Sequence, residues 1–395
     1  MAEPSTAETL RVSTPGRICL FGEHQDYLHL PVIAAAISLR ITINKDSHAV
    51  RHGRIVSAST PDRPRNDPPQ ADGVTDDVGT VRIRMPDVNS EDSFSLGKNS
   101  EPIPYVHDRD YLRSAVNILK RKGYTFPHGF DCTVHGEIPI GGGVSSSSAF
   151  VVAWIGFLAW ASDRNENLSA DLCAQYAVEA EVNEFSEPGG MMDQYASALG
   201  GLLAMDFHPG FAAERLSAKL GAFVLGESGE PKNTTFVLAN VKNRVLDIVK
   251  QLTARDPNFS LHTATPESIQ SKKGELDAAS FALLEGTVKN HFITREAREL
   301  CRTSAVNNLR LGKLLLDHQQ VLRDVLHIST PKIDRMLDAA MTAGALGGKI
   351  TGSGGGGCMF AYAPEHTEEV AEAITRAGGR AYVVRVSEGL RVETR

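Results

Sequence analysis

Several features that mark other protein classes are missing from this sequence. It has only five cysteines and no CxxC pair, which argues against a zinc ribbon or a disulfide framework and favours reduced thiols. Its longest apolar run, residues 149–161, is too short to cross a bilayer. No strongly basic stretch would attract nucleic acid, and residues 1–10 are too acidic and polar for a signal peptide. We therefore expect a cytoplasmic protein that contacts neither membranes nor nucleic acids.

The composition is that of an ordinary globular chain. Of its 395 residues, 42% are hydrophobic and 23% are charged, and 41 basic against 48 acidic side chains give a formal net charge of −7. This length predicts about two domains, which we place at 1–205 and 206–395. Residues 57–104 are rich in proline and aspartate and are expected to form a surface excursion with some β structure. Because the net charge is negative, local features must hold any anionic ligand.

The centre of the sequence is a glycine- and serine-rich stretch at residues 139–149. A strand pattern precedes it at 129–135, and an apolar helix pattern follows at 149–160. Glycines let backbone N–H groups approach a ligand, serines add hydroxyls, and the start of a helix carries partial positive charge. This combination suits a polyphosphate, and the alternative is a structural turn. A second glycine-rich loop at 352–357 indicates that the site lies at a domain junction.

Two further segments carry candidate reactive side chains. Glu23, His24 and Asp26 are concentrated beside Arg17, either as a functional cluster or as an ordinary surface turn. A helix with an acidic face, expected at 171–185, is broken by the Pro-Gly-Gly run at 188–190, and a new helix begins near residue 191. Asp193 in its first turn is either a helix cap or a reactive group that a ligand can approach over the glycines.

The remaining patterns predict mixed α and β structure. Strands are expected at 10–14, 39–43, 81–85, 199–205, 234–241 and 380–386, and helical segments at 110–122, 275–326, 333–343 and 368–377. The GxxxxGK[ST] run of ordinary P-loop enzymes and the GxSxG nucleophile elbow are both absent from the sequence. Serine hydroxyls and a carboxylate of the acidic helix could instead hold Mg²⁺, which makes phosphoryl transfer the reaction that uses all the parts.

Three segments resemble, in order, the three motifs of the GHMP small-molecule kinases: residues 15–27, 139–149 and 348–358. The resemblance runs nearly end to end. It implies an α+β fold of two domains, the first like ribosomal protein S5 domain 2 and the second ferredoxin-like, with the active site between them. It also implies ATP and Mg²⁺ as cofactors, a small-molecule substrate, and a monomer or homodimer.

The same resemblance assigns roles to individual residues. Asp193 would take the proton of the acceptor hydroxyl, and Arg17 would stabilise the transferring phosphoryl group. Ser147 and Glu181 would hold Mg²⁺. The expected substrate-binding residues are Glu23, His24, Asp26, Gly190 and Asp193. The expected nucleotide-binding residues are Gly141, Gly142, Gly143, Val144, Ser145, Ser146, Ser147, Gly354 and Gly355.

Features of two subfamilies are mixed in the sequence. Residues 22–27 and 192–195 resemble galactokinases, whereas 20–24, 31–37 and 344–352 resemble mevalonate kinases. Mevalonate kinases have lysine at the Arg17 position and lack Asp26, so we expect phosphorylation of a monosaccharide at its anomeric C1 hydroxyl. Cys19 and the Leu28-His29 pair depart from the galactokinase pattern, which leaves another hexose, an amino sugar or a uronic acid open. The alternatives are a mevalonate-type small-alcohol kinase and a catalytically silent sugar and ATP sensor.

Overall fold

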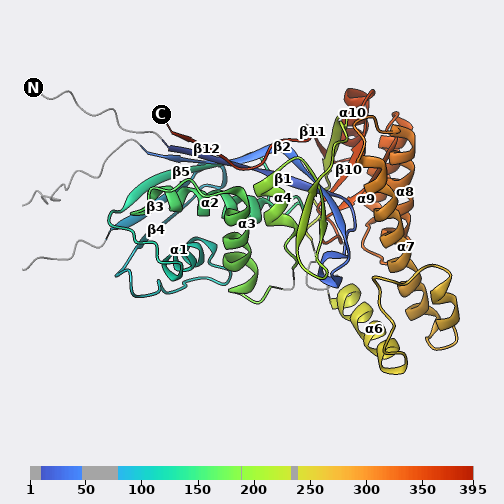
Figure 1. The fold of residues 1–395 in the computed structure, drawn as a ribbon. Helices are drawn as coiled ribbons and strands as arrows, with labels where there is room; N and C mark the ends of the chain where they lie inside the picture. The colour runs from blue at the N-terminus through green and yellow to red at the C-terminus, as the bar shows by residue number, and fades with distance from the viewer. Residues whose placement is uncertain (1–9, 47–78, 188, 233–238, 395) are drawn as a thin grey trace, which may run out of the picture.

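The computed structural model describes residues 10–46, 79–187, 189–232 and 239–394. These residues fold into two β-sheets, each covered by helices, as the predicted α+β class requires (Figure 1). The first sheet and its helices make up most of the N-terminal half. The second sheet and the long helices of the C-terminal half lie at the other end of the molecule.

The first sheet has the strand order β12-β1-β2-β5-β3-β4, and β6 and β7 extend it beside the opposite end of β2. All its pairs are antiparallel except β3 with β5. The strand bounds are Leu10–Phe21 (β1), Val32–Lys45 (β2), Thr80–Met85 (β3), Ser90–Ser95 (β4), Phe130–Gly136 (β5), Leu202–Asp206 (β6), Ala212–Arg215 (β7) and Arg391–Thr394 (β12).

Helices α2 and α4 pack on this sheet, α1 and α3 pack against these helices, and α2 is the central one. α2 is apolar on nearly every face, and Trp154 and Phe157 are among its fully buried side chains. The flanking helices start at side-chain caps where the sequence offers them: Asp110 caps α1 and Ser169 caps α3. The bounds are Tyr111–Arg121 (α1), Ser146–Ala161 (α2), Ala170–Val178 (α3), Glu179–Asn183 (the π-helical turn η3) and Met192–Leu199 (α4).

The second sheet has the antiparallel order β11-β8-β10-β9, which is the strand order of a ferredoxin-like domain. Its strands are Phe223–Glu227 (β8), Gly347–Thr351 (β9), Cys358–Tyr362 (β10) and Arg380–Val384 (β11). The helices of this half are Arg244–Arg255 (α6), Ala278–Cys301 (α7), Asn308–Asp324 (α8), Pro331–Thr342 (α9) and Thr367–Arg376 (α10). Short turns are η1 (Asp26–Leu28), η2 (Pro86–Val88), η4 (Ala239–Asn243) and η5 (Ser268–Lys272).

The structure differs in detail from several of the strands and segments expected from the sequence. The strand expected at 10–14 continues to Phe21, because a bulge at Pro15-Gly16 keeps β1 paired with β2. In the 57–104 segment, 57–78 lie outside the described residues, while β3 and β4 join the first sheet with buried apolar side chains. For the strand expected at 234–241, residues 234–238 are not described, and Ala239–Asn243 form a π-helical turn, so that part of the prediction is wrong.

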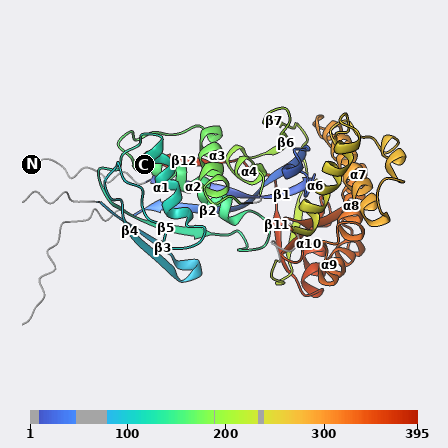
Figure 2. The same cartoon turned by 90° about the horizontal axis from the view of Figure 1, so that it is seen from below.

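The two halves meet along β1 and β9. The Cys19 amide donates to the Thr351 hydroxyl, and the Lys349 ammonium donates to the Cys19 carbonyl. Figure 2 shows the end of β1 reaching the C-terminal helices, and there Gln25 donates to the Thr287 carbonyl of α7. β7 and β12, from the predicted second domain, pair with the first sheet, so the halves are joined by strands as well as by side chains.

Candidate active site

The serine loop, residues 141–147, leads from the Pro139 turn into α2. Gly141, Gly143 and Ser145 have positive φ angles of 69°, 84° and 60°. A left-handed backbone is unusual for serine. Ser145 is the residue immediately before α2, and its side chain makes no capping hydrogen bond to the helix. The Ser145 Oγ is buried and has no hydrogen-bond partner among the described residues, while the Ser147 side chain is exposed. Free donors at the start of a buried helix form a site for an anion.

The serine loop lies directly against the third-motif loop, residues 352–357. The Cys358 amide donates to the Gly142 carbonyl over 2.8 Å. A Cβ on Gly143 would lie 2.7 Å from the Thr351 carbonyl oxygen, and one on Gly352 would lie 2.6 Å from the Gly143 Cα. Only glycine allows this approach, so the two glycine-rich loops come together at the junction of the halves, as the sequence predicted.

Gly354 and Gly355 do not take part in this contact. A Cβ on Gly354 would lie 2.6 Å from the Ile328 side chain, and the Gly355 amide donates to the Ile328 carbonyl over 2.7 Å. The glycines of this loop that touch the serine loop are Gly352 and Gly357. Direct nucleotide binding by Gly354 and Gly355 stays a prediction.

Arg17 and Asp193 form a bidentate ion pair, although they are far apart in the sequence. The Arg17 Nε and Nη2 each donate to one Asp193 carboxylate oxygen over 2.8 Å, and Nη1 donates to the Gly143 carbonyl over 2.6 Å. Arg17 is buried, whereas the Asp193 side chain is 30% exposed. Burial works to lower the pKa of Arg17, but the Asp193 and Glu23 carboxylates outweigh it and raise the pKa. The guanidinium therefore stays charged and fixes a half-exposed carboxylate beside the serine loop.

Local structure explains how this pair forms. The β1 bulge lies at Gly16, where a Cβ would be 2.8 Å from the Val144 carbonyl, and the Arg17 amide donates to that same oxygen. The strand is thereby held against the serine loop with the Arg17 side chain aimed at it. Asp193 lies in the first turn of α4 and accepts no capping hydrogen bond. Of the two roles considered for Asp193, the cap is excluded.

The tip between β1 and β2, residues 22–27, places its three candidate residues differently. The Glu23 carboxylate is occupied on both oxygens, by the Lys349 ammonium at 2.6 Å and the Gly352 amide at 3.0 Å. Both His24 ring nitrogens have partners, the Tyr27 hydroxyl at 2.8 Å and the Ser353 carbonyl at 3.0 Å. Burial lowers the pKa of His24, so its ring is neutral near pH 7. Substrate contacts by Glu23 and His24 stay predictions.

Asp26 lies near the ion pair of Arg17 and Asp193. Its Oδ1 accepts from the Tyr27 amide, and a Cβ on Gly190 would lie 2.0 Å from its Oδ2. Burial, and next the charge of Asp193, raise the pKa of Asp26 to about 6. Asp26, Gly190, Asp193 and Arg17 therefore lie close together.

The expected Mg²⁺ ligands also lie together. Glu181 is buried on the π-helical turn η3, a type of distortion that is frequent at functional sites. Burial raises its pKa, and hydrogen bonds from Gln194, Ser148 and Ser147 oppose the rise. Gln194 Nε2 donates to Glu181 over 2.6 Å. A carboxylate beside hydroxyls is an all-oxygen donor set that fits Mg²⁺, which uses few protein ligands and keeps waters or phosphate oxygens.

The comparisons with known proteins agree with this geometry. Residues 110–201 match the GHMP kinases N terminal domain, 299–381 match the GHMP kinases C terminal domain, and 4–44 match the galactokinase galactose-binding signature. The chain is 30% identical to a mevalonate kinase of Thermococcus onnurineus over 96% of this chain and 97% of that enzyme. The chain belongs to the GHMP kinase family. It is therefore an ATP-dependent phosphotransferase that acts on a small molecule.

Other GHMP kinases share the fold at lower identity. A galactokinase of Mannheimia succiniciproducens is 29% identical over 92% of this chain and 88% of that enzyme. The Lactococcus lactis galactokinase complexed with galactose superposes with a TM-score of 0.76 at 21% identity, covering 97% of this chain and 95% of the other. The Methanococcus jannaschii mevalonate kinase gives 0.68 at 20%, covering 98% and 100%. These structures establish the GHMP kinase fold.

Two lysines of this GHMP kinase site were missed in the sequence. Lys349 is fully buried on β9 and pairs with Glu23. The signal that could have identified it is a lysine within a short strand pattern that ends in Thr351-Gly352. Lys232 lies half-buried against the third-motif loop, with its Cγ 3.1 Å from the position of a Cβ on Gly357. No local pattern marks Lys232, because its place depends on contacts between distant segments.

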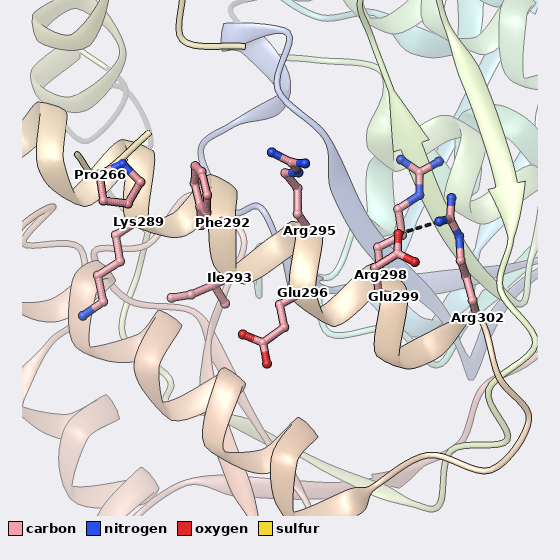
Figure 3. Close-up of a pocket in the computed structure, with 9 residues that line it drawn as sticks. All are labelled: Pro266, Lys289, Phe292, Ile293, Arg295, Glu296, Arg298, Glu299 and Arg302. Atoms are coloured by element: carbon pink, nitrogen blue, oxygen red, sulfur yellow. Dashed lines mark hydrogen bonds and ion pairs between the residues drawn. The ribbon is translucent and has the colours of Figure 1, made fainter. Parts of the chain in front are cut away.

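A separate surface hollow of about 600 Å³ runs along α7 (Figure 3). Its arginines are largely paired: Arg298 binds Asp206 and Glu214, and Arg302 binds Glu214 and Glu299. None of its lining residues belongs to the three motifs. They are Pro266, Lys289, Phe292, Ile293, Arg295, Glu296, Arg298, Glu299 and Arg302. In the described part of the chain, no helix is long and apolar enough to cross a membrane.

Proposed function

We propose that this GHMP kinase phosphorylates a monosaccharide at its anomeric C1 hydroxyl. The Asp193 carboxylate accepts the hydroxyl proton while the sugar oxygen forms a bond to the γ-phosphorus of ATP. The bond from phosphorus to the β–γ bridging oxygen breaks, and ADP leaves. Arg17 holds the carboxylate in position and offsets the charge on the transferring group.

The nucleotide phosphates are assigned to the serine loop. Its left-handed turns and its Ser145 hydroxyl, which has no partner in the described part of the chain, supply donors at the start of α2. Mg²⁺ would be held by Ser147 and Glu181, and it would neutralise phosphate charge during the transfer. The two loops meet around Gly142 and Gly143, so the phosphates would be enclosed from both halves of the protein.

The observation that carries the proposal is the position of Asp26 beside Gly190 and Asp193. A carboxylate can accept hydrogen bonds from two neighbouring hydroxyls at once, which suits a sugar. Two carboxylates in one pocket would repel an acceptor that carries its own carboxylate, as mevalonate does. The match of residues 4–44 to the galactose-binding signature supports the same reading.

A mevalonate-type small-alcohol kinase is the second candidate. It is favoured by the 30% identity to the Thermococcus onnurineus mevalonate kinase over 96% of this chain. Lys232, in the region of Asp193, could offset part of the repulsion of an anionic acceptor. A silent sugar and ATP sensor is less well supported, because Arg17, Asp193, Glu181 and the serine loop are all in place.

The test is a coupled ADP-release assay with purified protein, ATP and Mg²⁺. The acceptor panel contains galactose, other hexoses, amino sugars, uronic acids and mevalonate. We expect turnover with a sugar, and ³¹P and ¹H NMR of the product to show phosphate on C1. Turnover with mevalonate and no sugar would overturn the proposal, and ATP binding without any turnover would favour the sensor. Asp26→Ala should raise the sugar KM at least about 10-fold by removing charge-assisted hydrogen bonds.

A further inference from the structure

The segment that follows β8, residues 228–232, is fastened to the third-motif loop. The Ser228 amide and hydroxyl both donate to the Gly357 carbonyl, over 2.9 and 2.7 Å. The Gly357 amide in turn donates to the Glu230 carbonyl over 2.9 Å. The Glu230 carboxylate accepts from the Thr330 hydroxyl at the start of α9, over 2.5 Å. These bonds fix the backbone immediately before Lys232.

The Lys232 side chain is held over the place where the two glycine-rich loops meet. Its Cγ lies 3.1 Å from the position that a Cβ on Gly357 would take. That same position is 2.8 Å from the Gly142 carbonyl oxygen, so Gly357 lies between the lysine stem and the serine loop. The half-buried stem therefore extends from the C-terminal half toward the site assigned to the phosphates.

The charge on Lys232 is not neutralised by an ion pair with any residue that the structure describes. Burial, and next the charge of Arg17, lower its pKa, and Asp193 acts in the opposite direction. Arg17 itself is fully engaged with Asp193 and the Gly143 carbonyl. A half-buried lysine beside a second cation, whose ammonium has no hydrogen-bond partner among the described residues, gains most when an anion binds.

We propose that Lys232 is a further catalytic residue, which binds the γ-phosphate oxygens of the nucleotide from the side of the third-motif loop. This assignment of Lys232 rests on the proposed kinase function, but it is the same for a sugar and for any other acceptor. Ser147 and Glu181 would hold Mg²⁺ beside the phosphates from the N-terminal half, and Lys232 completes the enclosure from the C-terminal half. Because the γ-phosphate carries the charge that ADP lacks, Lys232 should discriminate between the two nucleotides.

The experiment compares binding of ADP and a non-hydrolysable ATP analogue, AMPPNP, each with Mg²⁺, by titration calorimetry. Lys232→Met removes the charge and keeps most of the stem. We expect the affinity for AMPPNP to fall about 10- to 100-fold, the worth of a charge-assisted hydrogen bond. The affinity for ADP should change less than about twofold, a shift that is worth little in free energy. Lys232→Arg should recover part of the AMPPNP affinity.

The matched control is Lys289→Met, which removes an exposed lysine of α7 outside the three motifs and should leave both affinities unchanged. An unfolding curve for each variant separates loss of binding from loss of fold. Unchanged AMPPNP affinity in Lys232→Met, or an equal loss for ADP and AMPPNP, would overturn the assignment of Lys232. A raised acceptor KM with normal AMPPNP binding would also overturn it, because it would place Lys232 on the acceptor. If the wild-type protein binds neither nucleotide, the proposed kinase function itself fails.

Discussion

Lys349 and Glu23 form a buried ion pair that joins the two halves of this GHMP kinase. The Lys349 ammonium lies 2.6 Å from the Glu23 carboxylate, and their side chains are 0% and 4% exposed. The ammonium also donates to the carbonyls of Cys19 and Ile350, so all three of its N–H groups are used. The second Glu23 oxygen accepts from the Gly352 amide at the entrance to the third-motif loop. The pair therefore sets the position of that loop relative to the tip at residues 22–27.

Substituting one partner of this ion pair should destabilise the protein more than substituting both partners together. Lys349→Met leaves a buried, unpaired carboxylate, and loss of one partner of such a pair costs about 3–5 kcal/mol. The double variant Lys349→Met with Glu23→Gln removes both charges and should recover much of the loss. Urea unfolding of the wild type, both single variants and the double variant measures the coupling. Additive effects of the two substitutions would contradict a direct interaction.

Asp193→Asn should abolish turnover while nucleotide still binds. The amide keeps the size of the side chain but cannot accept the proton of the acceptor hydroxyl, and general-base catalysis typically contributes about 10²–10⁴-fold. The readouts are kcat in the coupled assay and AMPPNP affinity by calorimetry. Asp171→Asn is the matched control, because Asp171 also lies in the first turn of a helix, α3, but is exposed. Near-normal turnover of Asp193→Asn would remove Asp193 from the role of base.

Local patterns predicted the centre of the site well. The strand, loop and helix around the serine loop follow from a change of hydrophobic period over residues 129–160, and α2 is as fully buried as its composition indicated. The start of α4 was predicted because the Pro-Gly-Gly run at 188–190 ends the preceding helix. The partnership of Arg17 with Asp193 came from the family resemblance, since no local pattern relates residues this far apart.

Long-range pairing explains what the sequence did not predict. β12 returns from the end of the described chain to pair with β1, and no nearby residue specifies that partner. The substrate role of Glu23 came from the family resemblance and stays a prediction, whereas its pairing with Lys349 on another sheet was not predicted. The strand expected at 10–14 stopped before Pro15, whereas a bulge lets the strand continue through Pro15 and Gly16.

The pKa of Asp26 predicts a pH dependence for sugar phosphorylation. Burial, and next the Asp193 charge, raise this pKa from its usual value to about 6, so the carboxylate forms as the pH rises through about 6. The ionised form is the better acceptor of sugar hydroxyls, and kcat/KM for the sugar should rise through the same range and then level off. Asp26→Asn should give a lower and flatter profile of kcat/KM against pH between about pH 5 and pH 8, the range around the shifted pKa.

The raised pKa of Asp26 also makes the free energy of unfolding depend on pH. The native state keeps the Asp26 proton to a higher pH than the unfolded chain does, because the folded pKa lies above the unfolded one. Between about pH 4 and about pH 6 the unfolded chain is ionised at Asp26 while the native state is still protonated, so the free energy of unfolding falls as the pH rises through this range. Asp26→Asn removes this slope and should be stabilising relative to wild type at neutral pH but not at pH 4. A wild-type kcat/KM profile that is flat across pH 6 would contradict the functional assignment of Asp26.

Gly190→Ala tests whether the space beside Asp26 belongs to the substrate site. A Cβ at residue 190 would lie 2.0 Å from the Asp26 Oδ2, far inside contact distance, so Asp26 would have to move. We expect the sugar KM to rise at least about 10-fold, since a carboxylate displaced by about an ångström loses its hydrogen bonds. Gly189→Ala is the matched control, because a Cβ there would meet nothing within 4 Å. Steady-state kinetics with the best acceptor should show the loss only in Gly190→Ala and only in the sugar KM, with the KM for ATP unchanged. Equal effects of the two substitutions would mean that the Pro-Gly-Gly turn acts through its backbone flexibility and not through the space beside Asp26.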